Sequence, residues 1–184
     1  MEPEAVQLSI ENIFAQSMRK YDTCCFSGHR PHKLGFGFDF NNKCGTFLDL
    51  EKKLKAEIKN AIKEGYKFFI SGAGLGVDML AADIVIKLKR KHDIQLCLAI
   101  PCLDHTKKWS QSDKSLYKKI LKNSDEIFFV NNKNYFIGCM QARNKYLVDQ
   151  SNRLIAVFNG EKGGTKQTID YAKKSFLEIK IIDI

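Results

Sequence analysis

The chain has 184 residues and a formal net charge of +9, with 44% hydrophobic and 28% charged residues. This length allows one compact domain with a substantial core, and the composition excludes a disordered chain. No apolar run approaches the ~18 residues of a membrane-spanning helix, and Glu2, Glu4 and Glu11 stand where a signal peptide would be basic. We therefore expect a cytoplasmic protein with no membrane partner.

Hydrophobic periodicity predicts an N-terminal extension followed by one domain. Residues 1–22 form the extension, in which an apolar set between Ile10 and Met18 indicates either one helix or an extended segment that packs on the domain. The domain covers residues 23–184. Strands are predicted at 23–26, 67–71, 94–100, 126–130, 153–158 and 178–182, and helices at 47–62, 77–91, 114–123, 138–150 and 164–176.

The alternation of strands and helices indicates an α/β fold. Some predicted strands, such as Leu154–Phe158, are apolar on both faces, as expected for a parallel sheet covered by helices on both sides. With right-handed crossovers, the sequence predicts a Rossmann-like, doubly wound, mainly parallel sheet with helices on both faces. Residues 31–45 are the one long irregular stretch, which is a candidate lid or ligand-contacting loop.

An apolar strand ends in three alternate glycines and the chain then restarts as a helix. Glycine admits positive φ and lets an anion approach backbone N–H groups, and a helix start adds unpaired N–H groups. This pattern predicts a site for a nucleotide or a phosphosugar. The spacing differs from the dinucleotide fingerprint and no P-loop lysine follows, and a turn without a ligand is the alternative. The candidate residues here are Ser71, Gly72, Gly74, Gly76 and Asp78.

Two further loops follow predicted strands and carry residues suited to an anion. Ligands of open α/β sheets bind beyond the carboxyl ends of the strands, where these loops would meet the glycine loop. The guanidinium group of an arginine can donate two parallel hydrogen bonds to the oxygens of one phosphate. The alternative role for each arginine is an ion pair at the protein surface. The candidates are Gly28, His29 and Arg30 in the first loop, Gly163, Gly164 and Thr165 in the second, and Arg143 in a helix.

Other chemistry has little support in the sequence. The six cysteines include no C-x-x-C pair, and His29 and His32 have no acidic residue nearby, so we predict no metal site and no cofactor. Most lysines fall on predicted helix faces, where they are typical of solvated surfaces. The positive charge would still gather phosphorylated ligands, and nucleic acid stays open as a partner, although no basic run is interleaved with aromatic residues.

Five motifs in order resemble the YpsA-like family of the SLOG superfamily, from about Thr23 to the C-terminus. They are Ser27–Pro31, Ile70–Asp78, Ile100–Trp109, Arg143–Asp149 and Gly163–Thr165. The resemblance implies a Rossmann-like fold that binds a nucleotide-derived ligand at its glycine loops. Relatives include LOG phosphoribohydrolases, the DNA-processing protein DprA and sensors of NAD-derived cyclic nucleotides. The resemblance is also compatible with a homodimer or a tetramer.

The chain departs from the LOG pattern at residues that matter for hydrolysis. Arg143 is retained, but Lys166, Gln167 and Thr168 stand where LOG enzymes carry glutamates. Cleavage of an N-glycosidic bond normally needs a carboxylate, for which only Glu161 or Asp104 would substitute. Whether the protein is an enzyme is left open, with Arg143 as the catalytic candidate for a hydrolase. The leading interpretation is a binding or sensing domain for an ADP-ribose-like or NMP-like ligand. The alternatives are a nucleoside-monophosphate phosphoribohydrolase and DprA-like nucleic-acid binding.

Overall fold

The computed structural model describes residues 19–184, so the helix predicted for the N-terminal extension lies, up to residue 18, outside the described residues. Strands and helices alternate along the rest of the chain. The strands are β1 (Thr23–Gly28), β2 (Phe68–Ser71), β3 (Gln95–Ile100), β4 (Glu126–Phe129), β5 (Arg153–Phe158) and β6 (Glu178–Asp183). The helices are α2 (Gly45–Lys63), α3 (Val77–Lys89), α4 (Gln111–Asn123), α5 (Cys139–Asp149) and α6 (Gly164–Lys174), with a 3-10 turn η1 (Pro31–Lys33).

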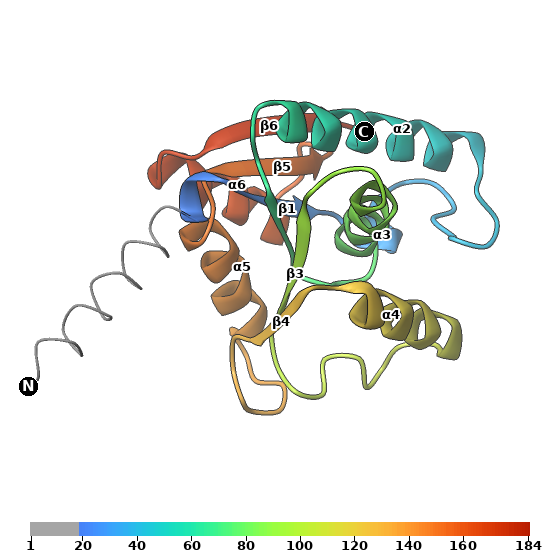
Figure 1. Cartoon of the computed structure of the whole chain (residues 1–184). Coiled ribbons are helices and arrows are strands. Elements are labelled where there is room, and N and C mark those ends of the chain that lie inside the picture. The colour runs from blue at the N-terminus through green and yellow to red at the C-terminus, as the bar shows by residue number, and fades with distance from the viewer. Residues whose placement is uncertain (1–18) are drawn as a thin grey trace, which may run out of the picture.

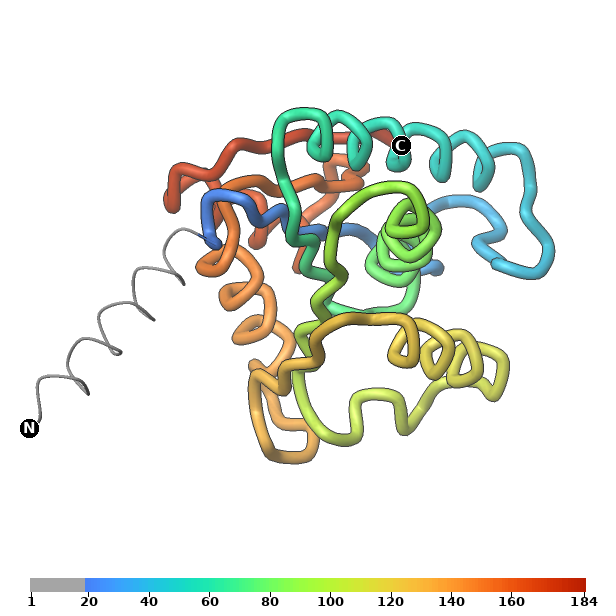
Figure 2. The backbone as a smooth tube through the Cα atoms, in the orientation of Figure 1, coloured from blue at the N-terminus to red at the C-terminus, as the bar shows by residue number. Residues whose placement is uncertain are grey.

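The described strands form a six-stranded sheet in the order β4-β3-β2-β1-β5-β6, and every pair in it is parallel. The predicted Rossmann-like, doubly wound fold is therefore confirmed (Figure 1). The chain moves outward from β1 to β4 and then returns to place β5 on the free side of β1, as Figure 2 traces. The strand order reverses between β1 and β5, which is where ligands bind in open α/β sheets.

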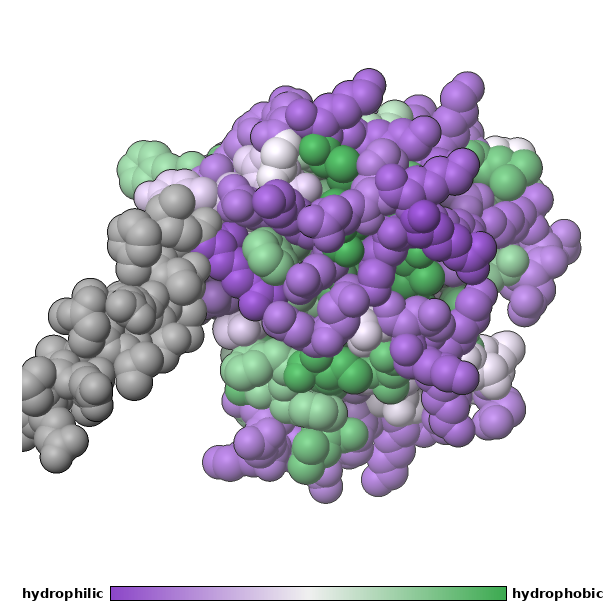
Figure 3. Space-filling view, viewed as in Figure 1, coloured by the Kyte–Doolittle hydropathy of each residue, from purple (hydrophilic) through white to green (hydrophobic). Residues whose placement is uncertain are grey.

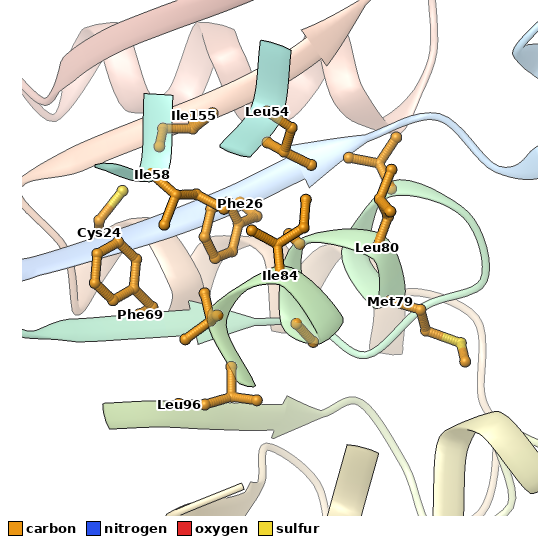
Figure 4. Close-up of a cluster of buried hydrophobic side chains, with 14 of the residues drawn as sticks. Cys24, Phe26, Leu54, Ile58, Phe69, Met79, Leu80, Ile84, Leu96 and Ile155 are labelled. Atoms are coloured by element: carbon orange, nitrogen blue, oxygen red, sulfur yellow. The ribbon is translucent and has the colours of Figure 1, made fainter. Parts of the chain in front are cut away.

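Helices cover both faces of the sheet. Side chains of α2, α3 and α4 join one face of the strands in the larger hydrophobic core, and side chains of α5 and α6 join the other face in a smaller one. Alternation along β3 shows the reason, because Leu96 and Leu98 point into the first core and Cys97 and Ala99 into the second. Figure 4 shows the larger core, in which α2 and α3 lie over the strands. Among the described helices, none is both long and apolar enough to cross a membrane.

Most element boundaries lie within two residues of the prediction, and two of the differences have clear local reasons. The helix α4 starts at Gln111, three residues before the predicted start, because Ser110 caps it: the Ser110 Oγ accepts a hydrogen bond of 3.1 Å from the Asp113 N–H. The strand β1 runs two residues past its predicted end, as far as Gly28, through pairing with β5. The polar Ser27 and the glycine had hidden this extension in the sequence.

The end of β1 packs tightly against the start of α3. A Cβ atom at Gly28 would lie 2.5 Å from Val77, and one at Gly76 would lie 2.5 Å from the backbone oxygen of His29. Gly76 also has a φ of 95°, a conformation that side chains disfavour. The Val77 N–H donates to that same His29 oxygen at 3.4 Å. These glycines therefore hold the loop after β1 against α3, which positions His29.

We expect Gly76→Ala to destabilise the fold more than Gly65→Ala. Both glycines have positive φ, but a Cβ at Gly65 would have open space around it. Gly65→Ala should lower the free energy of unfolding by about 1–2 kcal/mol through backbone strain alone. Gly76→Ala should cost roughly 2 kcal/mol more, because a backbone atom must move. Urea denaturation of both variants checks this, and equal losses would contradict the tight β1–α3 packing.

Candidate ligand-binding site

A cavity of about 270 Å³ opens at the carboxyl ends of β1 and β5, where the strand order reverses. The loop after β1, the start of α3, one turn of α5 and the start of α6 form its walls. The lining residues are Phe26, Ser27, Gly28, His29, Arg30, His32, Lys33, Asp78, Met140, Arg143, Asn144, Gly163, Gly164 and Thr165. The cavity lies where open α/β sheets of this topology form their ligand-binding crevice.

The structure brings most of the predicted site residues to this cavity. Those that line it are Gly28, His29, Arg30, Asp78, Arg143, Gly163, Gly164 and Thr165. Those that do not line it are Ser71, Gly72, Gly74 and Gly76. The lining residues come from segments far apart in the sequence, and the parallel sheet gathers them at one edge.

A buried ion pair between Arg143 and Asp78 forms part of the cavity wall. The Arg143 Nη1 donates to the Asp78 Oδ2 at 2.9 Å, and only 8% and 11% of the two side chains are exposed. Burial raises the pKa of Asp78 above its usual value, while the Arg143 charge acts in the opposite direction. The Arg143 Nε has no hydrogen-bond partner among the described residues. The guanidinium thus keeps one unused donor in a nearly dry setting.

The glycine loop serves this ion pair. A Cβ atom at Gly72 would overlap the guanidinium of Arg143, and one at Gly74 would lie 3.1 Å from the Asp78 Oδ2. The Gly74 N–H also reaches Oδ2 at 3.4 Å, and the Ser71 Oγ donates to the Asp78 carbonyl oxygen at 2.8 Å. The sequence pattern suggested that these glycines leave room for a phosphate. The structure gives them a different reason, since the room is taken by the protein's own arginine.

His29 connects the two halves of the cavity. Its ring is almost fully buried and stacks on Phe158 at 5.8 Å, and its Nε2 accepts a hydrogen bond of 3.2 Å from the Asn159 N–H. Burial lowers the pKa of His29, and the neighbouring Lys33 lowers it further. The imidazole is therefore neutral near pH 7, and it holds the loop after β1 against the loop after β5.

Exposed positive charge lies at the rim, next to a helix start. Arg30 and Lys33 are exposed, and the Lys33 Nζ lies 3.6 Å from the Glu161 Oε2. The helix α6 begins at Gly164 and has no side-chain cap, so no side chain satisfies the N–H groups of its first turn. Gly164 and Thr165 bring that turn to the cavity. An anion placed here would meet free N–H donors and two flexible cations.

Carboxylates are scarce at the cavity. Asp78 is the one carboxylate that lines it in the described part of the chain. Glu161 pairs with Lys33, and the Asp104 Oδ1 accepts from the Tyr135 N–H at 2.6 Å. Gln167 lies in a separate groove between α5 and α6. Across residues 19–184, no group of three or more His, Cys, Asp or Glu side chains is arranged to hold a metal ion.

Sequence reasoning missed six lining residues and one neighbour. Phe26 and Ser27 lie at the end of β1, just before the predicted loop. His32 and Lys33 directly follow the predicted loop, while Met140 and Asn144 flank Arg143 on α5, so helical spacing around that arginine was the available signal. The neighbour is His105, which packs edge-on against Trp109 and Tyr117 at 5.1 Å each. Burial, with help from the Arg143 charge, lowers the pKa of His105 to about 4.

Comparisons with known proteins agree with this architecture. The family model described as the YspA SLOG family matches residues 24–184. The uncharacterized SPbeta prophage-derived protein YoqJ of Bacillus subtilis is 37% identical over 145 residues, which cover 72% of this chain and 85% of that protein. A UPF0398 protein of Halalkalibacterium halodurans is 32% identical over 152 residues, which cover 80% of this chain and 78% of the other.

Two solved structures share the fold. DNA processing protein A (DprA) of Streptococcus pneumoniae has a TM-score of 0.64 at 16% identity, over 91% of this chain and 52% of that one. DprA of Helicobacter pylori, described for its single-stranded DNA binding mode, has a TM-score of 0.59 at 16% identity, over 86% and 64% of the two chains. This chain therefore spans about half to two thirds of the DprA chains. At this identity the likeness concerns the fold alone.

We expect Arg143→Met to lower the free energy of unfolding by about 3–5 kcal/mol, because it leaves Asp78 buried without its cation. The raised pKa of Asp78 would rise further, so the folded state would take up a proton as the pH falls. The loss should therefore be larger at pH 8 than at pH 5. Adding Asp78→Asn should recover roughly 1–3 kcal/mol at pH 8. Urea denaturation at both pH values measures this, and a small, pH-independent loss would contradict the buried pair.

Proposed function

The chain belongs to the YspA SLOG family, and from that premise we propose that it binds a nucleotide-derived ligand, ADP-ribose-like or NMP-like, in the cavity between β1 and β5. The observation that carries the proposal is the buried Arg143–Asp78 pair in the wall of a cavity that the start of α6 also lines. A protein keeps such a pair desolvated at a cost, and perturbed ionisable groups in a cleft are typical of functional sites.

The phosphate of the ligand would occupy the positive side of the cavity. The unpaired N–H groups at the start of α6 and the absence of side chains at Gly163 and Gly164 let an anion approach the backbone there. Arg30 and Lys33 would close over it from the rim, each as a charge-assisted donor. The overall charge of +9 would raise the local concentration of anionic ligands.

The ribose would lie against Asp78. The Asp78 carboxylate accepts two hydrogen bonds, from the Gly74 N–H and from Arg143, and both reach Oδ2. The second oxygen, Oδ1, is therefore the acceptor that a ribose hydroxyl would use. Asn144 and Thr165 lie on the same cavity wall and supply further polar atoms. Carboxylate and hydroxyl groups in this arrangement suit a sugar between a phosphate and a base.

Binding has more support than hydrolysis. A phosphoribohydrolase needs a carboxylate to stabilise the oxocarbenium-like centre or to activate water. The cavity offers Asp78, which is already engaged by Arg143, and neither Glu161 nor Asp104 lines it. Ligand retention without turnover is the behaviour expected of a sensing domain.

We expect AMP, ADP-ribose, cyclic ADP-ribose or NAD to raise the melting temperature. A ligand at a hundred times its Kd adds about 2.7 kcal/mol of stability, which corresponds to roughly 5–10 °C for a chain of this size. Arg30→Ala should weaken binding of the stabilising ligand about 10- to 100-fold, because a charged hydrogen bond to phosphate is lost. Thermal shift and isothermal titration calorimetry measure both effects.

Arg90→Ala is the matched control, because it removes the same exposed charge at the end of α3, away from the cavity. It should leave the affinity unchanged. Chromatography of the same mixtures should show intact ligand. Release of free base that stops in Arg143→Met would favour the hydrolase instead, and the absence of a shift with all four ligands would count against the proposed site.

A second candidate function is binding of single-stranded nucleic acid. The DprA-like fold and the positive charge favour it, since the Helicobacter pylori DprA is described as binding single-stranded DNA. In this case the rim cations would contact successive phosphates in place of one mononucleotide. The two functions differ in how binding responds to salt, because a polyanion releases condensed counterions.

If nucleic acid is the ligand, binding of a labelled oligothymidylate should weaken steeply with salt. Contacts to even three phosphates predict a loss of roughly twentyfold between 50 and 200 mM salt. Arg30→Ala should reduce the logarithmic salt slope by about 0.7, whereas Arg90→Ala should leave it unchanged. Fluorescence anisotropy checks this. Weak binding that does not respond to salt would exclude the second candidate.

A further inference from the structure

One face of the sheet has an open groove beside α5. Three helices cover the other face, whereas α5 and α6 alone cover this one in the described part of the chain. A cavity of about 330 Å³ results, with Ile70, Cys97 and Ala99 in its floor and Phe128 and Tyr146 in its wall. The two wall rings stack at 4.8 Å, yet half of Phe128 is exposed. Figure 3 shows apolar side chains gathered over β4 on the molecular surface. We name this cavity the α5 groove.

The chain enters the described structure at the rim of the α5 groove. Arg19 donates to both oxygens of Glu126, at 3.0 and 2.8 Å, and to the Cys97 Sγ at 3.1 Å, while its guanidinium lies 4.2 Å from the ring centre of Phe68. Arg19 and the next two residues are helical, and the Asp22 N–H closes this turn on the Arg19 oxygen. A helix therefore ends at the groove, fixed there by four contacts.

The sequence before Arg19 suits a groove that has an apolar floor and a polar rim, on a basic protein. Residues 1–18 contain three of the 21 acidic residues and none of the 30 basic ones. Their apolar residues recur at helical spacing and would form one stripe. The stripe consists of Val6, Ile10, Ile13, Phe14 and Met18. The segment thus matches the floor and the aromatic wall of the groove in hydrophobicity, and it complements the rest of the chain in charge.

We propose that residues 1–18 pack as a third helix on this face of the sheet, in the α5 groove of their own molecule. Helices of a doubly wound fold run antiparallel to the strands, and a helix that ends at Tyr21 just before β1 has the same direction as α5. Eighteen helical residues span about 27 Å, which is enough to cover β4 from end to end. The apolar stripe would contact Phe128, Tyr146 and the groove floor.

Nuclear Overhauser effects in the full-length protein test the contact directly. We expect cross-peaks between the methyl groups of Ile13 and the ring protons of Phe128 or Tyr146. A sample that mixes labelled and unlabelled protein separates contacts within one molecule from contacts between two. Cross-peaks within one molecule support the proposal. Their absence, or cross-peaks that arise only between molecules, would overturn it.

Paired substitutions give a second measurement. Ile10→Glu with Ile13→Glu places two charges in the apolar stripe, whereas Asn12→Glu with Gln16→Glu adds the same charge on the opposite side of the helix. The first pair should speed hydrogen exchange of the β3 and β4 amides by about tenfold, because the covering helix is released. The second pair should leave exchange unchanged. Equal exchange in both variants and the unchanged protein would contradict docking in the groove.

Discussion

The ion pair between Arg143 and Asp78 is the constraint around which the carboxyl edge of the sheet is arranged. Asp78 belongs to α3 on one face of the sheet and Arg143 to α5 on the other, so the pair joins the two helical layers across that edge. Two charges with about a tenth of their surface exposed have lost most of their hydration, which costs several kcal/mol per ion unless each is well paired. The neighbouring backbone is shaped to make the pairing close.

This constraint explains the spacing of the glycines after β2. Gly72 leaves the space that the guanidinium fills, Gly74 keeps clear of the carboxylate, and Gly76 lets the loop after β1 come close to α3. Each glycine removes a different steric conflict, so their regular spacing does not reflect one function.

Local sequence patterns predicted much of the fold. The topology that these patterns imply predicted most of the residues that line the candidate site. Continuous apolar runs such as that of β5 predicted buried parallel strands, and the parallel order then put the loops after β1 and β5 at one edge. The start of α4 was missed because the first turn after its cap at Ser110 contains no apolar residue that would reveal the helical periodicity. The role of the glycine loop was not readable, because the partner of Asp78 lies 65 residues further along the chain. Only the folded chain shows that the space beside Gly72 is filled.

The helix α5 contributes residues to the walls of both cavities. Arg143 and Tyr146 are less than one turn apart on it, and each forms part of the wall of a separate cavity. Because the two residues belong to one turn of α5, a displacement of that turn would alter the walls of both cavities at once.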